Sequence, residues 1–272
     1  MTIKELELKA NSIRKAIVNM IYNAKGGHLG TSLSEVDILT YLFFSCMNID
    51  PESPKKEERD RFILSKGHGS EGLYCTLQAR GYFPEEWIDH YMDHSNPLTI
   101  HPTNKVPGIE VCTGALGHGL SIAAGIALSA KLNEKNYKCF ALTGDGELQE
   151  GSNWEAAMFA SQKKLDNFVW IIDYNKLQLF KSVEDTVSLE PIRGKLESFG
   201  FDVHEVDGND MTGIHNTFSS IDFTCGKPHA VIAHTTKGKG ISYAENVAAW
   251  HHKIPNTQEW EQAIKELNNA RV

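Results

Sequence analysis

The sequence predicts an α/β fold built on a doubly wound parallel sheet, with helices on both faces. Short apolar runs rich in β-branched and aromatic residues, which are typical of buried parallel strands, occur at 139–143 and 168–173. A helical stretch at 153–164 separates them and completes a strand–helix–strand unit. The alternation of strand and helix continues toward the C-terminus, as an open parallel sheet requires.

The region before the first strand is expected to be helical. Residues 3–24 carry apolar side chains at helical spacing, and Gly26-Gly27 end that helix. A second helix is expected over 34–44, with Ser32 or Ser34 as its N-cap, because short polar side chains satisfy the first free NH groups of a helix.

The remaining elements follow from the same periodicities. Proline-containing residues 94–113 are expected to form a long loop, which in a compact domain usually has a function. The other expected strands span 61–65, 202–206 and 229–235. One further helix is expected to begin after residue 69, and the others to span 84–93, 121–133, 191–199, 210–222 and 257–269.

The composition is that of a globular protein: 272 residues, 41% hydrophobic and 23% charged. No repeat or low-complexity linker divides it, so we predict one domain over residues 1–272. A net charge of −8 without a basic stripe argues against nucleic-acid and membrane partners. No long apolar run or signal peptide is present, and five scattered cysteines without a Cys-x-x-Cys pair predict buried, reduced thiols in a cytoplasmic protein.

Polar residues follow two of the predicted strands at their carboxyl ends. Gly144, Asp145 and Gly146 follow the 139–143 strand, and Asn175 follows the 168–173 strand. The glycines allow a sharp turn and a close approach to a phosphate. Mg²⁺ prefers oxygen ligands. We therefore predict a site for a divalent cation and a diphosphate, formed by Asp145, the Asn175 amide oxygen and a backbone carbonyl near Leu177. Gly-Asp-Gly alone would more simply be a turn, and Asn175 alone a helix cap.

Five histidines lie in loops that contain glycine or proline, next to the ends of predicted elements. Imidazoles bind phosphates and sugar hydroxyls and move protons near neutral pH. Each alone would more often be a capping or surface residue, but together they indicate a polyhydroxylated, phosphorylated substrate. They are His28, His68, His101, His118 and His252.

Two further patterns have simpler explanations. Gly67 to Gly72 match G-x-G-x-x-G, but a dinucleotide site needs a second strand where residues 81–93 are expected to be helical. His90, Asp93 and His94 share one helix face and could bind zinc, although a solvated face explains them better. No G-x-S-x-G elbow or Walker loop supports a hydrolase or an NTPase.

These residues together resemble the diphosphate-binding half of a transketolase, over essentially the whole chain. The Gly-Asp-Gly to Asn pair is shared with 2-oxo-acid dehydrogenases, decarboxylases and deoxyxylulose-phosphate synthase. The histidine loops narrow the resemblance, because they follow transketolase order. The matching motifs are Gly27-His28, Leu64-Ser-Lys-Gly-His68, His101-Pro102, Thr113-Gly-Ala-Leu-Gly117 and Lys237-Gly-Lys-Gly240 through His252.

The resemblance implies a binding site for thiamine diphosphate and Mg²⁺, or Ca²⁺ or Mn²⁺ in its place. Asp145, Asn175 and the backbone of Leu177 would hold the metal. The cofactor would lie along the Gly144–Gly146 turn. Its diphosphate would contact His68, Gly146 and His252, its aminopyrimidine the backbone of Gly114, and its thiazolium Leu116.

The resemblance also implies roles around the sugar and the second polypeptide. His28, His101 and His252 would contact sugar hydroxyls and serve proton transfers. Glu150 would lie at a subunit interface that links two active sites. His118 receives no role, since many members of the family have glutamine there.

The chain departs from a full-length transketolase by ending near the end of that enzyme's first domain. The glutamate that activates the aminopyrimidine has no match here. The resemblance therefore implies the N-terminal subunit of a split transketolase, which transfers a two-carbon ketol unit from a ketose to an aldose. It would be active only with a C-terminal subunit that carries the pyrimidine-binding domain, and an α₂β₂ assembly is expected by analogy.

Residues 179–183 depart from the short Asp-Gly turn expected after the asparagine motif. Phe180 and Lys181 would reshape the pocket or the interface, which points to an unusual sugar such as a sulfonated or branched ketose; neutral drift is the alternative. Two other functions stay open. One is a subunit of a 2-oxo-acid dehydrogenase or of a synthase of the deoxyxylulose-phosphate type, and the other is a non-catalytic cofactor-binding module.

Overall fold

The computed structural model describes residues 1–179 and 181–270, and it contains a five-stranded sheet in the order β1-β2-β3-β5-β4. Every pair of neighbouring strands is parallel, which confirms the predicted fold class. The strands are β1 (Arg61–Leu64), β2 (Cys139–Gly144), β3 (Phe168–Tyr174), β4 (Asp202–Asp207) and β5 (His229–His234).

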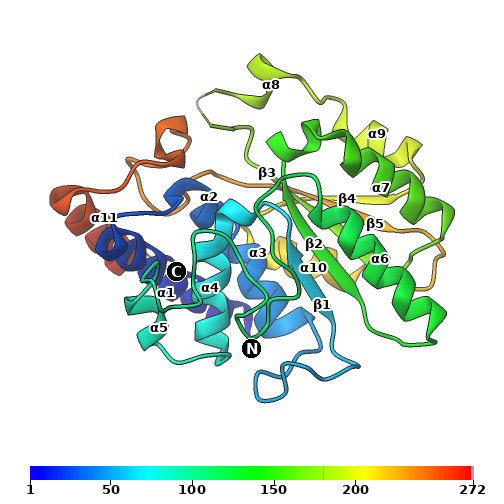
Figure 1. The fold of residues 1–272 in the computed structure, drawn as a ribbon. Helices are drawn as coiled ribbons and strands as arrows, with labels where there is room; N and C mark the ends of the chain where they lie inside the picture. The colour runs from blue at the N-terminus through cyan, green and yellow to red at the C-terminus, as the bar shows by residue number, and fades with distance from the viewer. Residues whose placement is uncertain (180, 271–272) are drawn as a thin grey trace.

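Helices cover both faces of the sheet (Figure 1). One layer contains α6, α7 and α9, and α6 packs directly on β1 and β2. The other contains α1, α3, α4 and α10. The helices are α1 (Ile3–Ala24), α2 (Leu29–Ser34), α3 (Val36–Tyr41), α4 (Ser70–Arg80), α5 (Glu86–Asp89), α6 (Gly119–Leu132), α7 (Gly151–Gln162), α8 (Val183–Thr186), α9 (Ile192–Ser198), α10 (Met211–Ser219) and α11 (Thr257–Asn269).

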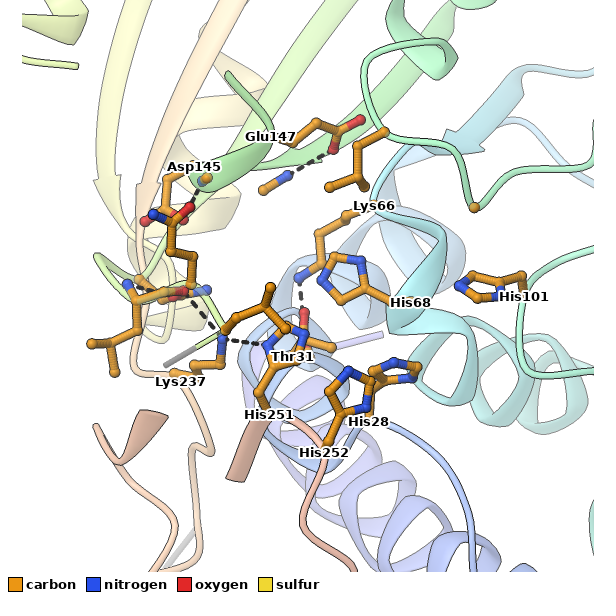
Figure 2. A pocket seen from close by; sticks show the side chains of 18 residues that line it. His28, Thr31, Lys66, His68, His101, Asp145, Glu147, Lys237, His251 and His252 are labelled. Carbon is orange, nitrogen blue, oxygen red and sulfur yellow. Dashed lines mark hydrogen bonds between the residues drawn. The ribbon is translucent and has the colours of Figure 1, made fainter. Parts of the chain in front are cut away.

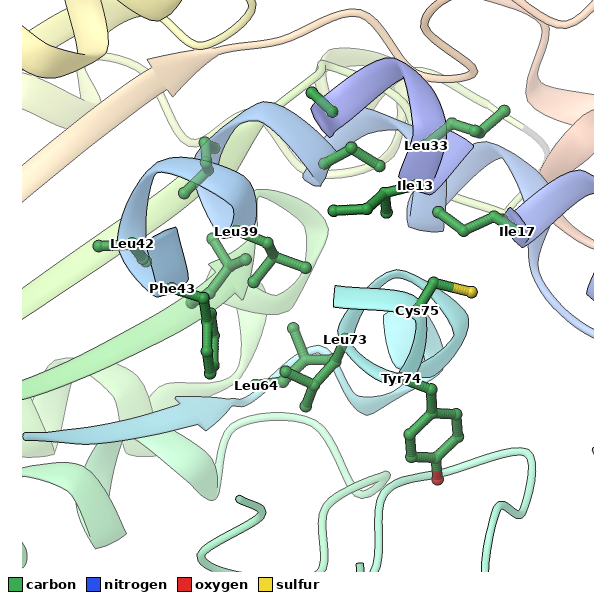
Figure 3. Close-up of a cluster of buried hydrophobic side chains, with 14 of the residues drawn as sticks. Ile13, Ile17, Leu33, Leu39, Leu42, Phe43, Leu64, Leu73, Tyr74 and Cys75 are labelled. Atoms are coloured by element: carbon green, nitrogen blue, oxygen red, sulfur yellow. The ribbon is translucent and has the colours of Figure 1, made fainter. Parts of the chain in front are cut away.

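The central strand β3 shows why the sheet is buried on both faces. Val169 and Ile171 pack into one core cluster with α1, α3 and α4, whereas Trp170 and Ile172 pack into the other with α6, α7 and α9. Side chains alternate between the faces of a strand, so a strand that is apolar at every position has two cores to fill. Figure 3 shows part of the first cluster.

Helix α1 begins and ends where the sequence predicts. Thr2 is its N-cap: its hydroxyl accepts from the Glu5 backbone NH, and the Glu5 carboxylate accepts from the Thr2 backbone NH. Lys25 ends the helix in the left-handed conformation. The apolar face of α1 therefore lies against α4 and α11 in a defined register.

The predicted helix at 34–44 was wrong in its start. The chain turns at His28 and forms α2 and α3, followed by a π-helical turn at Leu42–Cys46. Ser32 and Ser34 are not caps. Their buried hydroxyls donate to the carboxylates of Glu71 and Asp173, at 2.7 Å and 2.6 Å.

Two other expectations need correction. The helix expected at 84–93 is only the single turn α5, whereas 94–113 forms a loop without helix or strand, as predicted. Of the five cysteines, only Cys75 and Cys139 are buried, while Cys112 and Cys225 are exposed. No helix in the described part of the chain is both long and apolar enough to cross a membrane.

Two residues of α1 test how much its buried face contributes to stability. Ile17 is fully buried, whereas Leu8 is 52% exposed on the same helix. Ile17→Ala should lower the free energy of unfolding by about 2–5 kcal/mol, because it removes buried methyl groups and leaves a cavity. Leu8→Ala should change it by less than about 0.5 kcal/mol. Urea unfolding of both variants measures this difference, and equal losses would contradict the packing of α1.

Candidate functional site

A cavity lies at the carboxyl ends of β2 and β3 (Figure 2). In open α/β sheets this edge is where ligands bind, because loops from neighbouring strands meet there. All but one of the residues assigned to the site from the sequence line this cavity. They are His28, His68, His101, Gly114, Leu116, Gly144, Asp145, Gly146, Asn175, Leu177 and His252.

Asp145 has an environment that suits a cation ligand. Its carboxylate accepts from the backbone NH groups of Gly146 and Lys176, at 2.7 Å and 2.5 Å. Burial, with the nearby Asp173 carboxylate, raises the pKa of Asp145 to about 7. A divalent cation at this carboxylate would favour its ionised form and offset the cost of burying it.

The segment that follows β3 supplies two further oxygens. Asn175 is buried, and its amide oxygen accepts from the Leu177 backbone NH at 3.1 Å while its amide NH₂ donates to Asp173 at 3.3 Å. These bonds orient the amide. The Leu177 carbonyl accepts from Lys237 Nζ at 3.1 Å. Carboxylate, amide and carbonyl oxygens are the ligand set that a hard divalent cation takes.

A buried ion network lies beneath the cavity. Lys66 Nζ is 3.0 Å from Glu35 Oε2, forms an ion pair with Asp173, and donates to the Thr31 carbonyl at 3.3 Å. Burial opposes ionisation of Asp173, but Lys66 holds the pKa of that carboxyl below its usual value. Burial raises the pKa of Glu35 to about 8.

Lys237 places a second ammonium group beside the cavity. It is 2% exposed, and its Nζ also lies 3.0 Å from His251 Nδ1. Burial and the Lys66 charge lower the pKa of Lys237 to about 8. A buried ammonium group beside the cavity favours an anionic ligand such as a diphosphate.

Five histidines, His28, His68, His101, His251 and His252, gather on one side of the cavity (Figure 2). The His28 ring centroid lies 4.4 Å from His252, 5.6 Å from His68 and 6.1 Å from His101. Burial, together with His252 and His101, lowers the pKa of His28 to about 4. Burial and Lys237 lower the pKa of His251 to about 3. His28 and His251 are therefore neutral near pH 7, where each can donate one hydrogen bond and accept another.

Two features of the cavity wall stand out. The Nδ1 atom of His28 is buried without a hydrogen-bond partner among the described residues, and buried polar atoms are normally paired. Gly114 has a φ of +146°, and a Cβ there would lie 3.1 Å from the His101 ring. A side chain at 114 would therefore be strained and would crowd the cavity wall.

Two residues that were assigned roles from the resemblance are exposed in the structure. Glu150 is exposed and precedes α7, outside the cavity. His252 is exposed beside His28, whereas its neighbour His251 is buried and contacts Lys237. The geometry therefore favours His251 at the phosphate end and His252 at the open end. His118, which received no role, is exposed at the start of α6.

Several residues of the site were not singled out from the sequence. Lys66 directly precedes Gly67-His68, and Lys237 begins the Lys237-Gly-Lys-Gly240 motif. Both lysines could therefore have been found from these motifs. Glu147 ties three segments together by accepting from Ser65, Gly117 and Gly144, and its contacts follow only from the fold. The full set is Thr31, Lys66, Glu147, Gln178, Lys237 and His251.

Both competing patterns keep their simpler explanations. Gly67–Gly69 is a short helical turn before α4, and the strand after β1 begins only at Cys139, which rules out a dinucleotide-binding unit there. His90 and Asp93 form an exposed pair with Nδ1 2.9 Å from the carboxylate.

The neutral histidines predict a pH dependence of stability. An unfolded chain protonates His28 near pH 6.5, whereas the folded chain does so only near pH 4. The folded state should therefore lose stability as the pH falls through this interval. His28→Gln should lose less unfolding free energy than the wild type between about pH 7 and about pH 5. Urea unfolding measures this, with exposed His90→Gln as the control; a wild-type slope in His28→Gln would contradict it.

The family comparisons agree with this geometry. Residues 6–268 match the family described as "Transketolase, thiamine diphosphate binding domain". The chain is 48% identical to one of the subunits of the apulose-4-phosphate transketolase of Phocaeicola vulgatus, covering 98% of this chain and 95% of the relative. It is 50% identical to the protein of the same name from Actinobacillus succinogenes, and 38% identical to the 6-deoxy-6-sulfo-D-fructose transketolase subunit SqwG of a Clostridium species.

Solved structures show the same fold in longer chains. Transketolase from Campylobacter jejuni superposes with a TM-score of 0.93 at 31% identity, covering 98% of this chain and 43% of that one. Transketolase from Pichia stipitis in complex with sedoheptulose 7-phosphate gives 0.91 at 29% identity, covering 41% of its length. The chain thus spans about two-fifths of the length of these enzymes. It belongs to the transketolase family and carries that family's thiamine-diphosphate-binding domain.

Proposed function

We propose that this chain is the thiamine-diphosphate-binding subunit of a two-chain transketolase that transfers a two-carbon ketol unit from a ketose phosphate to an aldose. The observation that carries the proposal is the juxtaposition, in one cavity, of an oxygen ligand set at Asp145 and Asn175 with the ammonium group of Lys237. This combination suits a metal-bridged diphosphate.

Mg²⁺ would be held by the Asp145 carboxylate, the Asn175 amide oxygen and the Leu177 carbonyl. The Lys237 ammonium group and the buried His251 would hydrogen-bond the diphosphate. Gly146, at the turn after β2, offers a backbone that a phosphate can approach closely. Thiamine diphosphate, when bound, supplies the nucleophilic carbon at which the bond next to a ketose carbonyl is broken and formed.

Three histidines of the cavity would act on the sugar. His28, His101 and His252 line the cavity, and imidazoles can hydrogen-bond hydroxyl groups. A neutral imidazole such as that of His28 can also take a proton from a hydroxyl and return it to a developing alkoxide. His68 would hydrogen-bond the diphosphate.

A second chain would complete the site. Three relatives that match this chain over nearly their whole length are named as subunits, whereas the matched transketolase of Campylobacter jejuni is more than twice as long. We propose that the partner contributes the pyrimidine-binding domain, in an α₂β₂ assembly. A non-catalytic module is disfavoured, because every predicted metal ligand is present and brought together.

The donor that we propose is apulose 4-phosphate. The two relatives named for that sugar are 48% and 50% identical to this chain, against 38% for the sulfofructose enzyme and 35% for human transketolase. This choice agrees with the expectation of an unusual sugar from residues 179–183. Phe180, on which that expectation partly rested, lies outside the described residues.

Asp145 tests the metal and the cofactor together. Asp145→Ala should weaken magnesium-dependent binding of thiamine diphosphate at least about 100-fold, since losing one partner of a buried charge pair costs about 3–5 kcal/mol. Glu150→Ala is the matched control, because its carboxylate lies outside the cavity, and it should bind as the wild type does. Calorimetric titration with and without Mg²⁺ measures both. Unchanged binding in Asp145→Ala would remove the metal assignment.

Activity tests the division into two chains. The purified chain with Mg²⁺ and thiamine diphosphate should transfer no ketol unit. Co-purification with the C-terminal partner subunit should restore transfer. Apulose 4-phosphate should then be turned over at least about 10-fold more efficiently than xylulose 5-phosphate or fructose 6-phosphate, a margin of about 1.4 kcal/mol. Turnover by the chain alone would refute the split, and preference for pyruvate would indicate a 2-oxo-acid enzyme.

A further inference from the structure

A second group of ligand-type side chains lies at the opposite end of the sheet from the cofactor cavity. Asp202 is the first residue of β4, and His229 is the first residue of β5 and its direct partner in the parallel register. His204 follows Asp202 by two positions, so it lies on the same face of the strand. The pairing of β4 with β5 thus brings three potential metal ligands together from two strands.

Their atoms are already at ligand spacing. Asp202 Oδ2 is 3.0 Å from His204 Nε2 and 3.2 Å from His229 Nδ1, and the three ligand atoms all lie within 4.8 Å of one another. Zinc bonds of about 2.0–2.2 Å in a tetrahedron separate ligand atoms by about 3.3 Å. Small movements of the three side chains would therefore bring their ligand atoms to tetrahedral zinc spacing.

The surroundings orient the least mobile of the three ligands. The His229 side chain is fully buried, and its second ring nitrogen, Nε2, lies 3.9 Å from Cys225 Sγ. The Cys225 thiol in turn donates to the Lys227 carbonyl at 3.6 Å. If Nε2 carries the proton and donates to the sulfur, Nδ1 presents its lone pair to a metal, and such an outer partner commonly fixes the tautomer of a metal-bound histidine.

We propose that Asp202, His204 and His229 bind a divalent transition-metal ion of the zinc type, which joins the edge strand β4 to β5. Two imidazoles and one carboxylate favour Zn²⁺ over the hard ions Mg²⁺ and Ca²⁺, which take oxygen ligands. The Asp202 side chain is 42% exposed, so the ion has a path from solvent and room for water at its remaining position. The site is independent of the proposed function, since it lies away from the cofactor cavity.

The ion would matter most for the edge of the sheet. Strand β4 pairs only with β5 among the described strands, so its outer side has no hydrogen-bonded neighbour. Ligands on both strands would hold their first residues in register. Binding to the folded state alone raises the midpoint of thermal unfolding as the concentration of the ion rises.

Zinc binding by the full chain tests this proposal. After chelator treatment, competition with a chromophoric zinc indicator should show one zinc site that His204→Gln weakens at least about 10-fold, since even loss of an outer partner costs about 10–100-fold. Asp202→Asn should have a similar effect and serves if His204→Gln does not fold. His252→Gln controls for zinc at the cavity histidines and exposed His90→Gln for surface binding; both should keep the site.

Hydrogen exchange locates the ion. Zinc should slow exchange of the β4 amides in the wild type and in His252→Gln, but not in His204→Gln. Absence of micromolar zinc binding in the wild type, or equal binding by His204→Gln and Asp202→Asn to that of the wild type, would overturn the proposal and leave Asp202 as a hydrogen-bond acceptor for two histidines.

Discussion

The buried ammonium group of Lys66 holds together the elements that surround the cofactor cavity. It follows β1, pairs with Asp173 near the end of β3, and reaches Glu35 at the start of α3 and the Thr31 carbonyl in α2. Burying a charge is costly unless it is paired and hydrogen-bonded, so these partners cannot separate without a large penalty. Lys66 neutralises Asp173. Asp145, by contrast, accepts only from backbone NH groups among the described residues, so its carboxylate is free to bind a metal.

This constraint divides the cavity into two functional ends. At the inner end, oxygens from the β2 and β3 loops, the Lys237 ammonium group and His251 suit a metal-bridged anion. At the outer end, imidazoles suit hydroxyl groups, and burial keeps His28 neutral near pH 7. This division agrees with the proposal of a two-chain enzyme. This chain would supply the diphosphate grip and the sugar-facing histidines, and a second chain would supply the carboxylate that activates the cofactor.

The sequence predicted the sheet, most of the helices and the meeting of Asp145, Asn175 and Leu177 in one cavity, because each has a local signal. Apolar runs give strands, 3.6-residue spacing gives helices, and residues just after parallel strands must meet at one edge. It could not predict Glu35 or Glu147, whose roles depend on contacts between distant segments. The start of α2 was missed because Ser32 and Ser34, good caps by type, are used as buried donors. The sequence also could not show that His251 is buried and its neighbour His252 exposed, because that depends on the path of the backbone.

The most direct test of the account is whether this chain alone recognises the diphosphate rather than the rings of the cofactor. Calorimetric titration of the isolated chain with inorganic pyrophosphate and with thiamine, each with and without Mg²⁺, separates the two parts. The account predicts saturable, magnesium-dependent binding of pyrophosphate at one site per chain and much weaker binding of thiamine. Binding of thiamine without its diphosphate, or failure to bind magnesium pyrophosphate, would contradict it.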